Sequence, residues 1–101
     1  MQMLMKVQFP LQKFNAAVRD GSVGDKLGKI LGFIKPKGAF FTAENGCRGG
    51  TFVVEVNDPK QMPQFAEPFF LLFDAKVEYL PYMTPEDLAH SGLDKMNEMW
   101  P

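Results

Sequence analysis

The sequence predicts one small α+β domain of ferredoxin-like βαββαβ topology, with an extra C-terminal helix. Its 101 residues suffice for one hydrophobic core and not for a second. Strand-like alternation and helix-like spacing follow one another in the order β-α-β-β-α-β, which is the split βαβ arrangement. Right-handed crossovers then place both helices on one face of a four-stranded antiparallel sheet of order 4-1-3-2. The opposite face of the sheet is expected to stay bare.

The amino-terminal part of the chain predicts a strand followed by a broken helix. The strand is expected at Met3–Phe9, where apolar residues occupy every second position, and Pro10 ends it. The helical segment is interrupted near Gly21–Gly24 and closed by Pro36. Its apolar residues recur at the i, i+3, i+4 and i+7 spacing of an amphipathic helix: Leu27, Ile30, Leu31 and Ile34.

Two further strands are expected at Ala39–Glu44 and Thr51–Val56. The residues between them, Asn45–Gly50, contain Asn-Gly and Gly-Gly pairs, which adopt positive φ angles easily and predict a hairpin. The second helix should begin at Pro59 and run to about residue 67. It should end or kink before Pro68, because a proline inside a helix removes a backbone hydrogen bond.

The carboxyl end predicts a last strand and a helical tail. An apolar connection is expected at Phe69–Phe73, followed by a strand at Lys76–Tyr82. Thr84 then opens a third helix as its cap, with a proline at the first position and acidic residues in the first turn. Gly92 weakens that helix midway. The single domain thus has a core at about residues 3–83 and a C-terminal tail at 84–101.

Alternation divides the strand residues between two faces of different character. The face under the helices is apolar, as in a conventional core: Met3, Met5, Val7, Ala39, Phe41, Ala43, Phe52, Val54, Val56, Val77 and Tyr79. The other face is mixed: Leu4, Lys6, Gln8, Phe40, Thr42, Glu44, Thr51, Val53, Glu55, Lys76, Glu78, Leu80 and Tyr82. It has too many large apolar side chains for a solvated face and too many charges for a buried one. This composition predicts two sheets that meet around a partly wet cavity, and therefore a homodimer or a higher oligomer.

Composition excludes several classes of protein. The formal net charge is -1 and only Arg19 and Arg48 are arginines, so nothing indicates a nucleic-acid binder. A single cysteine, Cys47, excludes an internal disulfide. The longest apolar run, Phe69–Phe73, is far too short to span a membrane. We expect a soluble cytoplasmic protein, and no cofactor, because the sequence contains no nucleotide-binding or metal-binding motif.

The order of elements, the hairpin Phe40–Val56 and the carboxyl-terminal stretch together resemble a known group of proteins. The stretch begins with Glu67-Pro68-Phe69-Phe70 and ends with Glu78-Tyr79-Leu80-Pro81-Tyr82-Met83-Thr84-Pro85-Glu86-Asp87-Leu88. The chain resembles the dimeric α+β barrel proteins, which include muconolactone isomerase-like and antibiotic-biosynthesis monooxygenase-like members. The resemblance implies a dimer and a pocket between paired sheets. No catalytic motif of those enzymes matches this sequence residue by residue.

The candidate catalytic residues are charged side chains of the bare face. Lys6 lies on a central strand between the strands that hold Glu78 and Glu55, and Glu44 lies on the strand beyond. If the registers agree, a row Glu78–Lys6–Glu55–Glu44 crosses this face. A carboxylate in a desolvated cavity can act as a general base near neutral pH, which suits proton abstraction next to a carbonyl. The alternative is a solvated, charge-paired ladder at a dimer interface.

The candidate ligand-binding residues are Phe40, Tyr82, Phe69, Phe70 and His90. Phe40 and Tyr82 belong to the bare face, and the two neighbouring phenylalanines would form an apolar pocket wall. His90 would carry a proton into the cavity. Core or dimer packing is the alternative for the phenylalanines, and capping of the third helix is the alternative for the histidine.

Two functions are compatible with these patterns. The first is a dimeric small-molecule-binding protein, and, if an enzyme, a cofactor-independent isomerase or oxygenase that acts by acid–base chemistry between the sheets. The second is a non-catalytic ligand-binding or assembly module whose bare face serves only dimerisation. The volume between the sheets separates the two, because small-molecule sites usually need about 300 Å³ or more.

Overall fold

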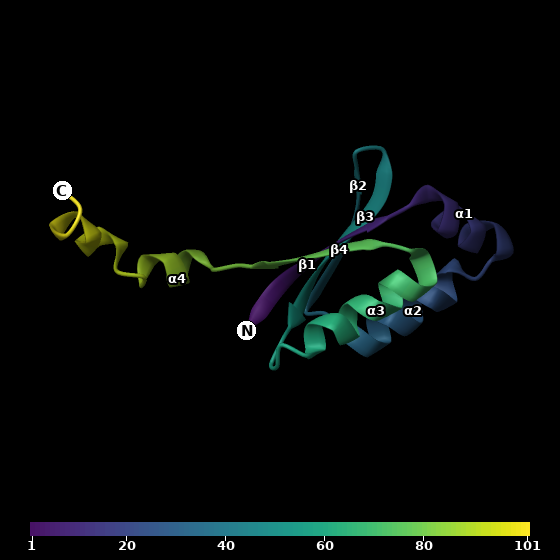
Figure 1. The fold of residues 1–101 in the computed structure, drawn as a ribbon, viewed down its shortest axis with the longest axis horizontal. Coiled ribbons are helices and arrows are strands. Elements are labelled where there is room, and N and C mark those ends of the chain that lie inside the picture. The colour runs from purple at the N-terminus through teal and green to yellow at the C-terminus, as the bar shows by residue number, and fades with distance from the viewer.

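The computed structural model describes residues 1–101 and confirms the predicted ferredoxin-like α+β fold. Four antiparallel strands form one sheet of order β2-β3-β1-β4, which is the predicted order read from the other edge. The helices α1, α2 and α3 lie together on one side of this sheet (Figure 1). The elements are β1 Gln2–Phe9, α1 Leu11–Asp20, α2 Val23–Ile34, β2 Gly38–Glu44, β3 Cys47–Glu55, α3 Gln61–Phe73, β4 Lys76–Pro81, α4 Pro85–Ala89 and the 3₁₀ helix η1 Leu93–Glu98.

The core lies between the sheet and the three helices and is built largely of phenylalanine rings. Phe9 contacts Phe14 and Phe73 edge-on, each with ring centroids 5.1 Å apart. Phe52 of β3 packs on Phe69 of α3 at 5.5 Å. Such ring pairs stabilise a core beyond the area they bury. The predicted core face is therefore confirmed for β1, β3 and β4, whereas Ala39, Phe41 and Ala43 of the edge strand β2, expected in the core, are exposed.

Helix α3 continues through Pro68, so the predicted end of this helix before the proline is wrong. The residues expected to form a connection, Phe69–Phe73, are its last turns. A proline in a helix costs about 3 kcal/mol, because it removes one backbone hydrogen bond and crowds the preceding turn. Phe69 and Phe73 are both fully buried, and burial of each contributes roughly 1.5–3 kcal/mol. Packing of the two rings thus offsets the cost of the proline.

The β2–β3 hairpin is tighter than predicted. Only Asn45 and Gly46 form the turn, both with positive φ angles, and β3 begins directly afterwards. The two glycines expected in the loop, Gly49 and Gly50, belong to the strand, where the chain packs closely. A Cβ atom at Gly49 would lie 3.1 Å from the backbone oxygen of Val7, so glycine serves close strand packing there and not a turn.

The tail leaves the end of β4 and runs away from the body of the protein (Figure 1). Thr84 and Asp87 form a reciprocal capping box at the start of α4, as the sequence predicts. The helix ends at Ala89, and Gly92, with φ of 82°, separates it from η1. The tail gives the molecule a length of 61 Å against 29 and 19 Å in the other directions. None of the helices combines the length and apolar character that crossing a membrane requires.

Candidate functional site

The bare face of the sheet presents side chains to which no helix is opposed. We define it by the strand residues that alternate with the core positions: Gln2, Leu4, Lys6, Gln8, Phe40, Thr42, Glu44, Thr51, Val53, Glu55, Lys76, Glu78 and Leu80. The strand registers arrange these residues in rows across the sheet. Polar rows occupy the two ends of the face, and an apolar row separates them.

The polar end nearer the hairpin is centred on Lys6. This residue lies opposite Glu78 of β4 and Thr51 of β3. Its Nζ atom also forms an ion pair with Glu44 Oε1 at 3.8 Å. We call Lys6, Glu44, Thr51 and Glu78 the Lys6 cluster. Three of the four predicted catalytic residues are therefore brought together.

Glu55 is the predicted catalytic residue that does not join this cluster. It lies opposite Gln2, four residues along β1 from Lys6, so the predicted row Glu78–Lys6–Glu55–Glu44 is wrong at this position. Its Oε1 atom is 3.4 Å from the amino group of Met1, and its Oε2 atom is buried without a partner. The register of β3 against β1 causes the difference, since it places Thr51 opposite Lys6 and Glu55 opposite Gln2.

At the other polar end of the bare face, Gln2 contacts Tyr82. The Tyr82 hydroxyl donates a hydrogen bond to Oε1 of Gln2. Gln2 was missed by the sequence prediction because the first strand was expected to begin one residue later. The alternation that places Leu4 and Lys6 on this face would have found it. This end holds Glu55 as well, so it forms a second polar group distant from the Lys6 cluster.

An apolar row lies between the two polar ends. Leu4 is flanked by Val53 on β3 and by Leu80 on β4. Leu80 is 41% exposed, and Phe40, beside Thr51 on the edge strand β2, is 61% exposed. Exposed side chains of this size on one sheet face are typical of an interaction surface.

Three predicted ligand-binding residues lie elsewhere. Phe69 is fully buried in the core, and Phe70 is partly exposed on α3, on the helix side of the sheet. His90 caps the end of α4 on the tail, where its backbone N–H donates to the carbonyl oxygen of Glu86. None of the three side chains faces the Lys6 cluster. Core packing describes the position of Phe69 and helix capping that of His90, whereas Phe70 lies at the surface of α3.

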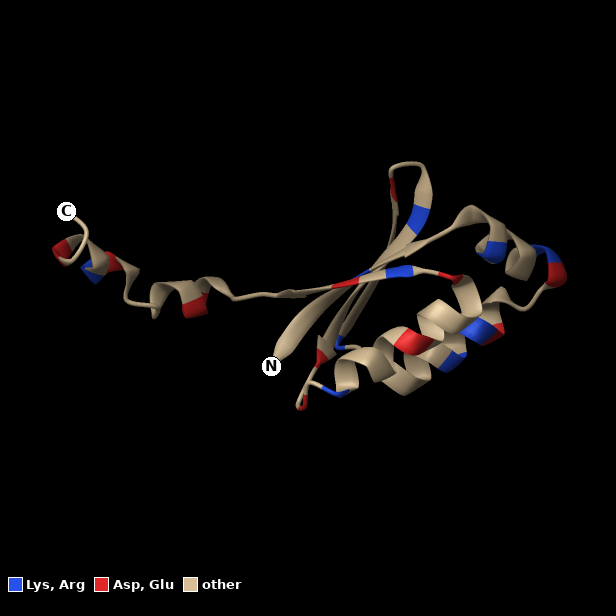
Figure 2. Ribbon diagram, in the orientation of Figure 1, with Lys and Arg blue, Asp and Glu red and all other residues tan.

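The Lys6 cluster surrounds a hollow of about 80 Å³ on the bare face. Lys76 lines the hollow together with Lys6, so two ammonium groups face the two carboxylates of Glu44 and Glu78. Figure 2 shows charges of both signs on β4 and beside the hairpin turn. The predicted row contained three acids and one lysine. The hollow instead has two lysines and two glutamates, so its charges balance. No three histidine, cysteine, aspartate or glutamate side chains converge as metal ligands.

This arrangement combines groups for three chemical tasks. An ammonium group can bind a negatively charged oxygen, and a neighbouring carboxylate can accept or donate a proton. The Thr51 hydroxyl can donate or accept a hydrogen bond. The exposed Phe40 ring offers an apolar surface for a planar molecule.

Comparison with solved structures supports the fold, whereas comparison of sequences finds no relative. No protein-family model and no curated protein sequence matches the chain. Among solved structures, the chain is similar to the 5-chloro-2-hydroxyhydroquinone dehydrochlorinase TftG of Burkholderia phenoliruptrix, in its complex with 2,5-dihydroxybenzoquinone. The similarity has a TM-score of 0.63 at 15% sequence identity and covers 85% of this chain and 97% of the other. The two proteins therefore share the ferredoxin-like α+β fold over most of their lengths.

Proposed function

We propose that this protein is a homodimer whose bare sheet faces meet and enclose a site for a small organic molecule. The observation that carries the proposal is the Lys6 cluster, which lies beside exposed apolar side chains on a face that no helix covers. Proton transfer between a glutamate of the cluster and the bound molecule is the chemistry that these residues support. Glu44 and Glu78 are the candidate bases, and Lys6 binds the oxygen on which negative charge develops.

The apolar row of the bare face supports the dimer. Leu4, Val53 and Leu80 form a continuous strip across three strands, and burial of apolar surface gains about 25 cal/mol per Å². Two sheets pack face to face at about 10 Å, a space that side chains normally fill, so a ligand needs a hollow such as the one beside Lys6. The exposed Phe40 ring would be covered by the same contact.

The ligand class follows from the side chains around the hollow. A planar ring would pack on Phe40, and its hydroxyl or carbonyl oxygens would bind the ammonium groups of Lys6 and Lys76. Removal of a proton next to a carbonyl by a glutamate would leave an enolate, and return of that proton at another carbon would complete an isomerisation. TftG is named for a hydroxylated aromatic substrate and was captured with a quinone, which are ligands of this kind.

The proposal is tested by titration of the protein with 2,5-dihydroxybenzoquinone, followed by NMR. We expect shifts of the backbone signals around Lys6, Thr51 and Glu78. Lys6→Gln should weaken binding roughly tenfold, because a hydrogen bond to a charged group contributes about 1.5–3 kcal/mol. Lys60→Gln, at the exposed start of α3, is the matched control and should bind as the wild type does. Equal binding by both variants, or shifts confined to the helix side, would contradict the proposal.

An assembly module without a ligand is the second candidate function. It is favoured by the size of the hollow, whose 80 Å³ in one chain is well below the 300 Å³ or more that is usual for small-molecule sites. The sheet of the partner subunit distinguishes the two candidates. Its side chains either enclose the hollow and leave it open for a ligand, or fill it. A crystal structure of the dimer with an inter-sheet cavity of ligand size supports the binding function, and a filled interface supports the assembly module.

A further inference from the structure

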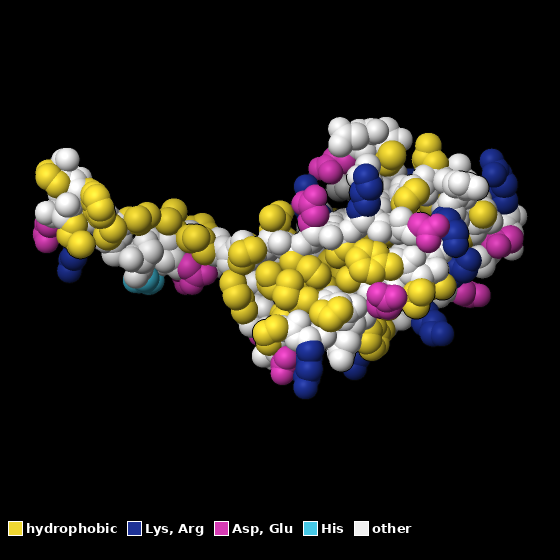
Figure 3. All heavy atoms as spheres, in the orientation of Figure 1, with side chains coloured by type: hydrophobic (Ala, Val, Ile, Leu, Met, Phe, Trp, Pro, Cys, Tyr) yellow, Lys and Arg dark blue, Asp and Glu magenta, His cyan; other side chains and the backbone are white.

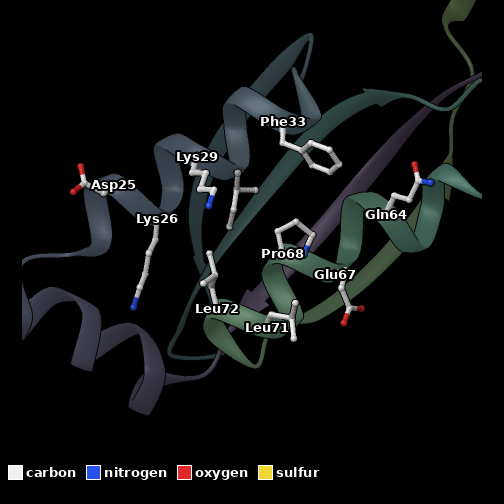
Figure 4. Close-up of a pocket in the computed structure, with 10 residues that line it drawn as sticks. Asp25, Lys26, Lys29, Phe33, Gln64, Glu67, Pro68, Leu71 and Leu72 are labelled. Atoms are coloured by element: carbon white, nitrogen blue, oxygen red, sulfur yellow. The ribbon is translucent and has the colours of Figure 1, made fainter.

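A second cavity lies on the side opposite the bare face. It is a groove of about 650 Å³ between α2 and α3, and its walls are largely apolar. Phe33 and Ile30 of α2 and Pro68, Leu71 and Leu72 of α3 line it, as Figure 4 shows for the labelled residues. Leu71 is 68% exposed. The core beneath the groove is formed by other residues of α3, Phe69 and Phe73, which are fully buried. The apolar surface of the groove is therefore left over from the folding of the single chain.

The tail presents a second apolar surface without a partner. Figure 3 shows hydrophobic side chains along the tail as well as over the helix side of the body. The exposed ones include Leu88, Leu93, Met96 and Trp100, and Trp100 is 73% exposed. Tryptophan and methionine side chains are enriched at the centres of protein interfaces. Exposure of these apolar side chains to water is unfavourable, so we expect another protein surface to cover them.

We propose that the groove between α2 and α3 binds the tail of a second copy of this chain. The tail, residues 84–101, carries four carboxylates and one lysine. The wall formed by α2 and the residues after it, 23–37, carries four lysines and the single acid Asp25. Two of these lysines, Lys26 and Lys29, line the groove itself, together with the acids Asp25 of α2 and Glu67 of α3. The charges of the tail and of the α2 wall are therefore complementary.

The lengths of the two surfaces also match. At a rise of 1.5 Å per residue, α2 and α3 are each roughly 20 Å long. The six residues of η1 span about 12 Å at the 2.0 Å rise of a 3₁₀ helix. The groove can thus accommodate η1 together with Trp100. A short amphipathic helix in an apolar groove between helices is a common mode of recognition.

The direction of the tail favours a second copy over the chain's own groove. After Pro81 the chain continues away from the helices, so the tail lies far from α2 and α3 of the same chain (Figure 1). An exchange between two copies is reciprocal, so both tails and both grooves are covered without any other partner. This interface is separate from the bare face, and its test therefore does not depend on the proposed ligand site.

Trp100 is the only tryptophan and reports on the docking directly. In the wild type we expect blue-shifted tryptophan emission and protection from acrylamide quenching. Leu71→Lys places a charge in the groove at an exposed position, so it should fold normally and lose both signals. Val18→Lys, at a 47% exposed apolar position of α1 outside the groove, is the matched control and should retain both.

Mixed oligomers then distinguish docking between copies from docking within one chain. The Leu71→Lys chain keeps Trp100 but its groove is expected not to bind a tail. A Trp100→Phe chain keeps an intact groove but has no tryptophan fluorescence. Unfolding and refolding the two together should restore blue-shifted, protected emission. Emission that stays red-shifted in this mixture, a water-exposed Trp100 in the wild type, or an unchanged signal in Leu71→Lys would each overturn the proposal.

Discussion

The two faces of the same sheet differ sharply, although they are made of alternating residues of the same four strands. On the helix side, Phe52 and Val54 of β3 are fully buried. On the bare side, the interleaved residues Val53 and Glu55 are only partly covered. The contact with the helices accounts for the folding of a single chain. The bare face, which adds little to that folding, retains charges and exposed apolar groups, and this indicates that its residues serve association and binding.

The largest effect is expected from a pair of phenylalanines, one on each face. Phe52→Ala empties a fully buried site and should lower the free energy of unfolding by about 3–5 kcal/mol. Phe40→Ala removes a ring that is 61% exposed in one chain and should leave the unfolding of the monomer nearly unchanged. Urea denaturation measures both. Similar losses from both substitutions at a concentration where the protein is monomeric would contradict the distinction between the faces.

A charge on the bare face tests its role in association. Val53→Lys introduces a lysine at the β3 end of the apolar row, and a symmetric dimer places two such lysines in the interface. We expect the dimer to weaken by at least about tenfold, since like charges at an interface cost several kcal/mol. Light scattering in a Leu71→Lys background, in which the tail is expected not to dock, should then give a mass near 11.4 kDa with Val53→Lys and twice that without it.

The control for this experiment is a lysine at an exposed apolar position away from the sheet. Leu11→Lys, at the start of α1, should leave the mass of the wild-type dimer unchanged. A wild type that is monomeric at micromolar concentration would contradict the sheet-face dimer.

The sequence predicts the two faces well because a side chain's face depends only on alternation along one strand. Which residues become neighbours across strands depends on the register between strands, which is harder to predict. Asn45-Gly46 and Gly49-Gly50 are both plausible turns, and the choice between them moves β3 relative to β2. Glu55 is separated from Lys6 by the register of β3 against β1, two strands that no turn joins, while the face of both residues stays as predicted. Local patterns alone do not select the register.

The helical layer shows a second limit of local patterns. Pro68 is a correct local signal for a helix end, yet α3 passes through it because Phe69 and Phe73 are buried against the sheet. The groove between α2 and α3 was also not predicted. It depends on how two helices that are distant in sequence lie side by side, and no spacing within either helix reports that distance.

The smallest expected effect concerns two tyrosines near the end of the sheet, one on each face. Tyr79 points to the helix side, where its hydroxyl donates a hydrogen bond to the carbonyl oxygen of Met62 at 2.6 Å, and burial raises its pKa to about 12. A tyrosine in the unfolded chain titrates near 10. Between about pH 10 and 12 the unfolded state has lost a proton that the folded state still holds. The free energy of unfolding should therefore fall as the pH rises through this window, and the contribution is fully present below it.

Tyr79→Phe separates this effect from the general alkaline loss of stability, to which the lysines contribute in every variant. The substitution should cost about 1 kcal/mol near neutral pH, because it removes the hydrogen bond to Met62. It should also make the decline in stability between pH 10 and 12 shallower than in the wild type. Tyr82→Phe, whose hydroxyl lies on the bare side, is the matched control and should keep the wild-type slope. Urea denaturation at a series of alkaline pH values measures the slopes. The same slope in Tyr79→Phe as in the wild type would show that burial on the helix side does not hold the proton on Tyr79.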